Sequence, residues 1–585
     1  MADFDIIIRG GTIHDGSGAQ PFVADVAVKD GIIARVGQVS GSADQEIDAA
    51  GMLVTPGFVD VHTHYDGQIT WENTLSPSSG HGVTTVVMGN CGVGFAPVRK
   101  GDEPLMIKLM EGVEDIPEVV MAEGVPFNWS TFPEYLDALD QRHSDIDFAA
   151  QLPHSPLRVF VMGQRGCDLE PPTAEDLAEM RRLTKEAIEA GAIGVTTSRT
   201  YAHRFRDGRP APSLHSEDEE ILTLAAGLAD AGKGVFQMVP SYDATREERV
   251  KLLRDIAKAS GRPVSFTFMQ TPNWPGDWEA TLRDLEQAEE DGLEIRGQVI
   301  PRPTGALLGL ELSLHPFSLN PSFRAIEDLP LAEKVEKMRD PEFRKRLMSE
   351  EPEDPQPFFK YIVSDLEALF VLGSPPNYNP RADESIAARA RAMGVDPKEL
   401  IYDALLQRDG KEVLYRPMGN AEGEKFESAG RNLVPHRLTF PALGDGGAHY
   451  SMICDAAYTT YFLTYWVRDA APDKKIELPF AIRKLTSDPA HAMGLDDRGL
   501  VKPGYKADLN VIDFERLQLY SPQTRYDLPK GGRRLTQRAD GYEATIVSGV
   551  VTYRNGRSTG NLPGRLVRGQ KAAPTAAPAK EAVPA

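Results

Sequence analysis

TAEDLAEMRRLTKEAIEAGAIGVTTS, residues 173–198, contains a helix followed directly by a strand. Thr173 is a typical N-cap, apolar residues recur at helical spacing from Leu177 to Ile188, and Gly191 is a typical helix end. The segment AIGVTTS that follows has the β-branched residues of a buried strand. These residues therefore predict one helix–strand unit of a larger repeat.

The same helix–strand pattern recurs through the middle of the chain. Ser216 and Glu219 predict a capping box for the next helix, which leads into the strand GVFQMV. Two more helices lead into PVSFTFM and EIRGQVI, and further candidate strands raise the total to about eight: residues 53–62, 83–89, 146–151 and 438–445. About eight such units predict an α/β fold, a TIM-like (β/α)8 barrel with its active site at the carboxyl ends of the strands. An open doubly wound sheet is the alternative, but the sequence has no Gly-rich phosphate loop after a first strand.

The two ends of the chain read as short strands with tight turns such as Asp30-Gly31 and Asn555-Gly556. We expect both ends to pair into one small β-sandwich domain. Residues 301–437, which contain helical segments and many prolines, predict an insertion over the barrel mouth. The alternative is a segment that packs at the side of the barrel. The expected boundaries are 1–55 and 491–568 for the β-domain, 56–490 for the barrel, 301–437 for the insertion and 569–585 for a disordered, Ala/Pro-rich tail.

Composition narrows the class of protein. The chain has 585 residues, of which 41% are hydrophobic and 26% charged, as is typical of a globular protein. A net charge of −22 argues against nucleic acid and anionic membranes as partners, which favours a small-molecule substrate and leaves a homo-oligomer open. No apolar stretch approaches the roughly 18 residues of a membrane span, and MADFDIIIRGG is not typical of a signal peptide. Three scattered cysteines favour a reducing, cytoplasmic location.

GFVDVHTHYDG, residues 57–67, places two histidines at the end of an apolar strand. Residues two apart on a strand point to the same face, so the rings of His62 and His64 are expected to lie side by side. Two converging imidazoles suit a divalent metal ion. The alternative is a pair of loop histidines with ordinary hydrogen bonds.

Two further candidates follow other strands. Cys91 comes after GVTTVVMGN, where a thiolate would be a good zinc ligand and a small buried side chain is the alternative. Asp445 ends LTFPALGD, where a carboxylate could bind a metal and take a proton from its water, or simply form a turn. His449, four residues on, could contact substrate or cap a helix, and we favour the cap.

GFVDVHTHYDG, GVTTVVMGNCG, LGDGGAH and LTSDPAHAMGLDDRGLVKPGYKADLNVID resemble the amidohydrolase superfamily and, within it, the N-acyl-D-amino-acid deacylases, or D-aminoacylases. The resemblance extends to about residue 566. It implies a TIM-like barrel flanked by a β-domain from both termini, and hydrolysis of an amide bond by water activated by one or two zinc ions.

The resemblance also implies roles for single residues. His62 and His64 match paired metal ligands on the first strand, and Cys91 matches a cysteine that bridges metal ions. Asp445 matches the general acid/base on the eighth strand. On the substrate side, the matching positions are His154, after the third strand, and Tyr201.

One departure concerns the metal ligands. The deacylases carry a metal-binding histidine at the end of the fifth strand and another at the sixth, but GVFQMVPSYD and PVSFTFMQTP contain none. The nearest polar residues are Gln237, Asp243 and Gln270, and an amide is a poor zinc ligand. Two accounts stay open: a reduced site from His62, His64 and Asp445, with or without Cys91, or completion by one of the histidines 203, 215 and 449.

The sequence therefore predicts a metal-dependent hydrolase that cleaves the amide bond of a small N-acylated amino acid or related amide. Arg199 or Arg204 could bind a substrate carboxylate, with a surface role as the alternative. Cleavage of a cyclic amide, a lactone or another acylated small molecule is a second reading, although AIGVTTSR lacks the lysine that hydantoinase-type enzymes carboxylate. A metal-free binding or scaffold protein is the third.

Overall fold

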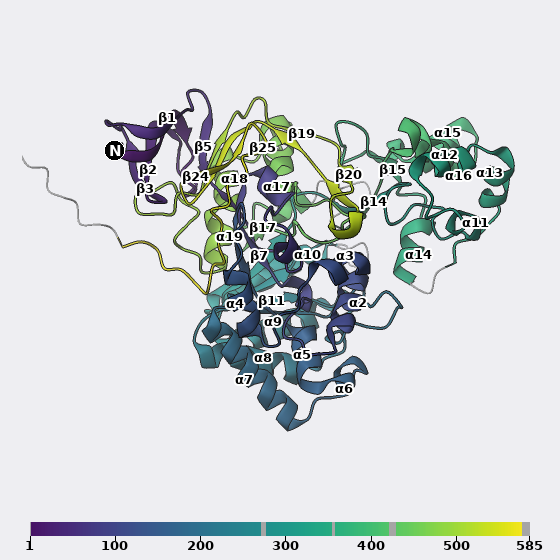
Figure 1. Ribbon diagram of the computed structural model, residues 1–585, viewed down its shortest axis with the longest axis horizontal. Helices are drawn as coiled ribbons and strands as arrows, with labels where there is room; N and C mark the ends of the chain where they lie inside the picture. The colour runs from purple at the N-terminus through teal and green to yellow at the C-terminus, as the bar shows by residue number, and fades with distance from the viewer. Residues whose placement is uncertain (1, 271–275, 354–356, 420–428, 576–585) are drawn as a thin grey trace, which may run out of the picture.

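Parallel strands surrounded by helices form the body of the molecule (Figure 1). The structure is a computed structural model that describes residues 2–270, 276–353, 357–419 and 429–575. One parallel sheet has the order β17-β13-β12-β11-β10-β9: Thr439–Pro441, Ile295–Val299, Val264–Thr267, Val235–Val239, Gly194–Ser198 and Leu152–Pro153. A second has the order β6-β7-β8: Phe58–Asp60, Val83–Met88 and Asp147–Ala150. This arrangement confirms the predicted α/β class.

Helices alternate with these strands along the chain: α7 (Ala174–Ala190), α8 (Asp218–Ala231), α9 (Arg246–Ser260) and α10 (Asp277–Glu290). The helix predicted at residues 173–190 is confirmed, because Thr173 forms a capping box with Asp176 and Gly191, with a φ of 119°, ends the helix. The capping box predicted for α8 was wrong. Its N-cap is Glu217, and the Ser216 hydroxyl donates to the backbone of Ser213 at 2.9 Å.

The segments that follow β6 and β17 lie side by side. The backbone N–H of Asp445 donates to the carbonyl of His62 at 3.1 Å, and that of His64 donates to Gly446 at 2.8 Å. A Cβ on Gly447 would lie 2.6 Å from the His64 carbonyl oxygen, so this close approach requires glycine. The carboxyl ends of the first and last parallel strands therefore meet at one place.

Strands from both termini pair in one nine-stranded sheet, with the order β25-β24-β23-β18-β5-β1-β2-β3 and β4 beside β1. From the N-terminal part come β1 (Phe4–Ile13), β2 (Phe22–Lys29), β3 (Ile32–Gly37), β4 (Ala43–Asp48) and β5 (Leu53–Pro56). From the C-terminal part come β18 (Leu509–Ile512), β23 (Tyr542–Val547), β24 (Val550–Arg554) and β25 (Arg557–Ser558). The join is at β5, where Val54 pairs with Ile13 on one side and Val511 on the other. The two ends thus share a sheet, as expected.

The segment between β13 and β17 forms a lobe that extends from one side of the body (Figure 1). Its three-stranded sheet consists of β14 (Thr304–Leu308), β16 (Leu414–Gly419) and β15 (Phe370–Val371). Its helices are α11 (Pro321–Arg324), α12 (Leu331–Met338), α13 (Pro341–Met348), α14 (Pro357–Ser364), α15 (Ile386–Met393) and α16 (Pro397–Leu405). Leu308, Phe343 and Tyr402 belong to a hydrophobic core within this lobe.

The last described residues correct part of the expected tail. The N–H of Lys571 donates to Gly494 at 2.8 Å, and its carbonyl accepts from Asp496 at 2.9 Å. Residues 569–571 are therefore held against the body, while residues 576–585 of the expected tail lie outside the described part of the chain. None of the helices described here has the length and apolar character needed to cross a bilayer.

Candidate metal centre

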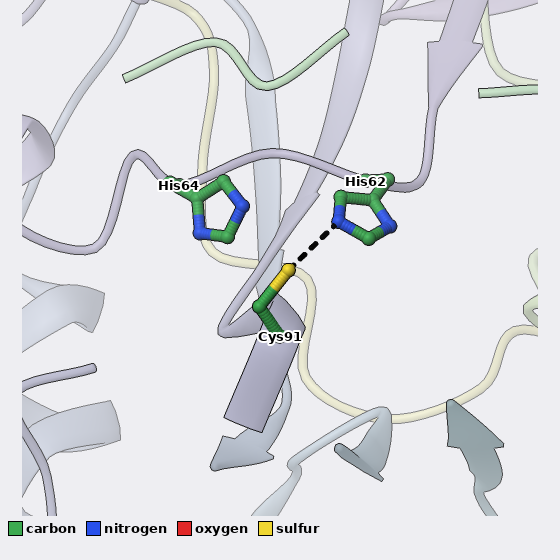
Figure 2. A group of neighbouring side chains, drawn as sticks. All are labelled: His62, His64 and Cys91. Atoms are coloured by element: carbon green, nitrogen blue, oxygen red, sulfur yellow. Dashed lines mark hydrogen bonds between the residues drawn. The ribbon is translucent and has the colours of Figure 1, made fainter. Parts of the chain in front are cut away.

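The two histidines after β6 converge with Cys91. Their rings lie with centroids 5.6 Å apart, and one ligating atom each of His62, His64 and Cys91 fits within a 4.8 Å span. Figure 2 shows the Cys91 sulfur between the two imidazoles, 3.3 Å from Nε2 of His62. The spacing of two residues thus places both rings on the same side, as the sequence predicts.

A sharp turn after β7 brings Cys91 to this place. Gly89, Cys91 and Gly92 all have positive φ angles, of 85°, 57° and 69°. A Cβ on Gly89 would lie 2.3 Å from the Gln151 carbonyl oxygen, so only glycine fits. A left-handed cysteine costs roughly 1 kcal/mol or more, which the surrounding contacts must offset.

Asn90 supplies those contacts. Its carboxamide donates to the backbone oxygens of Val61 (3.3 Å), Thr63 (3.1 Å) and Val87 (2.9 Å). Its own oxygen accepts from the side chain of Gln151 at 3.0 Å. One buried side chain therefore joins the turn that carries the cysteine to the segment that carries both histidines.

Asp445 adds a fourth ligating atom. Its Oδ1 lies 3.6 Å from Nε2 of His62 and 3.7 Å from Nε2 of His64. This oxygen is buried and has no hydrogen-bond partner among the described residues. Two imidazoles and a thiol within 4.8 Å of one another, with a carboxyl oxygen within 3.7 Å of both Nε2 atoms, are donors that zinc accepts, and the residues fit one divalent cation.

Burial sets the protonation of these donors. It lowers the pKa of His62 to about 4 and that of His64 well below its usual range, so both rings are neutral and able to ligate near pH 7. Burial also raises the pKa of Cys91 and of Asp445 well above their ordinary values. Cation binding at this centre is therefore coupled to proton release.

Gln298 fixes the orientation of His62. Its Oε1 lies 2.7 Å from Nδ1 of His62, while its amide nitrogen donates to Ser265 Oγ at 3.0 Å. Since an amide oxygen only accepts, Nδ1 of His62 carries the proton. The lone pair on Nε2 is then directed at Cys91 and Asp445.

Glu114 is a site residue that the sequence analysis missed. It ends α2 (Glu103–Glu114), is 1% exposed, and has Oε1 3.4 Å from Nδ1 of His64 and Oε2 3.5 Å from Nε2 of His449. The charged stretch around it resembles a solvated helix face. The signal was its position four residues after Met110, which places it on the apolar side of the helix.

His449 corrects another expectation. It does not cap a helix; it lines the cavity above the metal donors, and its backbone N–H donates to the Glu114 carbonyl at 2.5 Å. Burial lowers the pKa of its imidazole to about 4. His203 lines the same cavity, and burial lowers its pKa to about 3. His215 is exposed and lies outside the cavity wall.

The cavity has a volume of about 210 Å³. The four proposed ligands lie on its wall together with Glu114 and Asp115. The lobe between β13 and β17 contributes Thr304, Phe359 and Met418. The base of this lobe therefore forms one wall of the site, although most of the lobe extends sideways.

The ends of the fifth and sixth strands present no histidine to the cavity; Val239, Tyr242, Thr267 and Met269 line it there. Val239 and Met269 line it where the resemblance led us to look for histidines. Gln237 is buried but does not line the wall, Gln270 lines a neighbouring cavity, and Asp243 is exposed. No side chain at these two positions is thus a typical zinc ligand, whereas His203 and His449 line the cavity beside the metal donors.

Three expected substrate-side residues lie elsewhere. Arg199 donates to Asp218 at 2.7 Å and lines a different cavity. Arg204 donates to the backbone of Tyr201 at 2.9 Å, and Tyr201 itself is 43% exposed and outside the cavity wall.

His154 also has a different place from the one expected. It is fully buried, with Nδ1 2.8 Å from Thr197 Oγ1 and Nε2 2.7 Å from Glu220 Oε1. Both ring nitrogens are thus occupied by neighbours outside the metal cavity. The imidazole therefore links β10 to α8 and has a structural role.

Comparisons with known proteins show which proteins this chain is similar to. A D-aminoacylase of Alcaligenes xylosoxydans xylosoxydans is 26% identical over 579 residues, which cover 96% of this chain and 97% of that protein. A solved D-aminoacylase described by its binuclear metal centre is 25% identical, with a TM-score of 0.64 over 97% of this chain and 100% of that one. An N-acyl-D-glutamate deacylase from Bordetella bronchiseptica, solved with zinc and a phosphonate inhibitor, has a TM-score of 0.63 at 23% identity over 97% of this chain and 99% of that one. The amidohydrolase family model matches residues 45–553, and the chain belongs to this family of enzymes.

Proposed function

We propose that this protein hydrolyses the amide bond of a small N-acylated amino acid or related amide, with one Zn²⁺ held by His62, His64, Cys91 and Asp445. The observation that carries the proposal is the position of Asp445 Oδ1, buried, without a hydrogen-bond partner among the described residues, and within 3.7 Å of both Nε2 atoms. The D-aminoacylase relative supports the type of bond. Val239 and Met269 at the ends of the fifth and sixth strands support a single ion, because neither is a typical zinc ligand.

A zinc ion in this place lowers the pKa of water and polarises an acyl carbonyl. The side chains around it supply orientation. Gln298 holds Nδ1 of His62, and Glu114 faces Nδ1 of His64, so that both Nε2 atoms point to the same place. Asp445 accepts a proton from the attacking water and delivers it to the leaving nitrogen. The C–N bond breaks, a C–O bond forms, and the products are a carboxylic acid and an amine.

We further propose that the parallel strands of the two sheets, with β8 and β9 counted as one strand interrupted at Gln151, close into a TIM-like (β/α)8 barrel over residues 56–490. The hydrogen bond from Asp445 N to the His62 carbonyl, which joins the ends of β17 and β6, supports closure. A β-sandwich of residues 1–55 and 491–568 is supported by Ile7 and Ile8, neighbours on β1 that are both fully buried although they face opposite sides of the sheet. The three free cysteines, all buried, support a cytoplasmic location.

Asp445→Asn tests the proposed chemistry. It keeps the shape of the side chain but removes most of its basicity, so we expect kcat for amine release from an N-acyl amide to fall about 100- to 10,000-fold. Asp243→Asn, an exposed position outside the cavity, is the matched control. If Asp445→Asn keeps the turnover of the control, the proton-transfer role of Asp445 is refuted.

A further inference from the structure

The cavity around the metal donors has an unusual charge pattern. Among the described residues that line it there is neither a lysine nor an arginine. The acidic residues on its described wall are Glu114, Asp115, Asp445 and Asp455. A substrate that enters this space therefore meets no cationic side chain of the described wall.

The arginines near the metal cavity interact with groups outside the substrate space. Arg302 is 3% exposed, pairs with Asp455, donates to the Cys454 carbonyl at 2.9 Å and lies 3.7 Å from the ring centroid of Tyr378. Its charge offsets that of Asp455 behind the wall. It is not available to a substrate in the cavity.

Arg206 stacks on Phe359 and lines a cavity other than the metal cavity. Its guanidinium is 4.7 Å from the centroid of that ring, and it lines a separate cavity together with Lys334 and Arg533. Phe359 itself lines the metal cavity, whereas Arg206 is not part of the described wall. Arg199 and Arg204, the two arginines expected to bind a carboxylate, do not line the metal cavity at all.

The rest of the wall is largely apolar and adaptable. Val113, Phe359 and Ile453 line it together with Met269, Met418 and Met452. Methionine side chains adjust to apolar groups of different shape. A carboxylate that left water for this wall would lose its hydration without gaining a cationic side chain. If it reached the metal instead, it would occupy the position that the acyl carbonyl needs.

We propose that the substrate is a neutral N-acyl amide with apolar substituents and without a free carboxylate, such as an N-acyl amine or an N-acyl amino acid whose carboxylate is masked as an amide. This inference rests on the proposed amide hydrolysis and narrows its substrate class. It separates this chain from a deacylase that takes a free N-acyl amino acid.

A matched set of substrates tests the inference. The compounds are both enantiomers of N-acetyl-leucine, both enantiomers of N-acetyl-leucinamide, and N-(3-methylbutyl)acetamide. They share an acyl group and a branched alkyl group, but only N-acetyl-leucine carries a negative charge. With the zinc-loaded enzyme, we expect kcat/KM for the neutral compounds to exceed kcat/KM for the more rapidly hydrolysed enantiomer of N-acetyl-leucine at least about 10-fold. This ratio corresponds to about 1.4 kcal/mol. An equal or higher kcat/KM for the free acid overturns the inference.

A second readout separates this inference from the proposed function. Calorimetric binding of the same compounds to the zinc-loaded protein does not require turnover. If no compound is hydrolysed, the proposed function fails, and binding then decides the inference. Tighter binding of the neutral compounds, by about 10-fold or more, supports it. Equal or tighter binding of the acid overturns it.

A positive charge added to the cavity wall should reverse the preference for neutral substrates over the free acid. Met418 and Met269 are partly exposed on the cavity wall, so each can accept a side chain of similar length. Met418→Lys is expected to raise kcat/KM for N-acetyl-leucine at least about 10-fold relative to the neutral amide, while Met418→Gln keeps the original preference. Met269→Lys and Met269→Gln form a second pair should the first not fold. Failure of both folded lysine variants to shift the preference counts against the inference.

Discussion

Oε1 of Glu114 lies 3.4 Å from Nδ1 of His64, and both side chains are 1% exposed. The second oxygen of the same carboxyl group lies 3.5 Å from Nε2 of His449. A carboxylate behind a ligating histidine fixes the tautomer and the orientation of the ring. Glu114 therefore lies between a proposed metal donor and a histidine on the cavity wall.

Glu114→Gln is expected to weaken zinc binding about 10- to 100-fold, because it removes the carboxyl group that faces Nδ1 of His64. The measurement is the zinc Kd by competition with a chromophoric chelator. Glu111→Gln on the same helix, outside the cavity wall, is the control and should keep the wild-type Kd. Equal zinc affinities in the two variants would show that Glu114 has no part in the site.

Gly89→Ala should disturb the metal centre through the backbone. Gly89 has a φ of 85°, and a Cβ there would lie 2.3 Å from the Gln151 carbonyl. We expect a loss of about 1–3 kcal/mol in the free energy of unfolding and a weaker zinc Kd, because the turn that carries Cys91 must move. Gly80→Ala is the control, since no atom lies within 4 Å of its Cβ position. A Gly89→Ala variant with wild-type stability and zinc affinity would contradict this account of the turn.

Local patterns in the sequence predicted the part of the site that depends on one strand and its turn. His62 and His64 lie two residues apart just after β6, and their side chains converge as their spacing predicted. Cys91 and Asp445 each follow a parallel strand, so topology brings them to the same edge. The helix at residues 173–190 was predicted equally well from its N-cap, Thr173, and the glycine at its end, Gly191.

Tertiary packing decided the remainder. The sequence could not show that Glu114, in a charged stretch of helix, would pack against His64, or that the lobe would contribute Phe359. The alternatives for Arg199 and His154 depended on whether neighbours distant in sequence, Asp218 and Glu220, already satisfied them. The spacing of residues along the sequence does not reveal such partners.

Glu220 predicts a pH dependence of stability away from the metal centre. Burial alone would raise the pKa of Glu220, but hydrogen bonds and charge from His154 and Arg158 lower it from 4.5 to about 2. Because the folded pKa is depressed, this contribution to stability is complete above about pH 4.5 and is lost as the pH falls towards 2.

Glu220→Gln should therefore lower the free energy of unfolding near pH 6 by about 3 kcal/mol and flatten its decline below pH 4.5, since Arg158 loses its buried counter-charge. Urea unfolding at several pH values measures both effects. Glu217→Gln, an exposed position beside the same helix, should change neither. An unaltered pH slope in Glu220→Gln would exclude the proposed ion pair as its source.

The zinc content of protein purified without chelator tests the central claim most directly, with His62→Ala and the exposed His215→Ala measured alongside. The account predicts about one zinc per chain in the wild type and in His215→Ala, and a loss of that zinc in a folded His62→Ala variant. Two zinc ions per chain would contradict the single-ion site. A folded wild type that contains no zinc and takes up none on addition would contradict the metal centre itself.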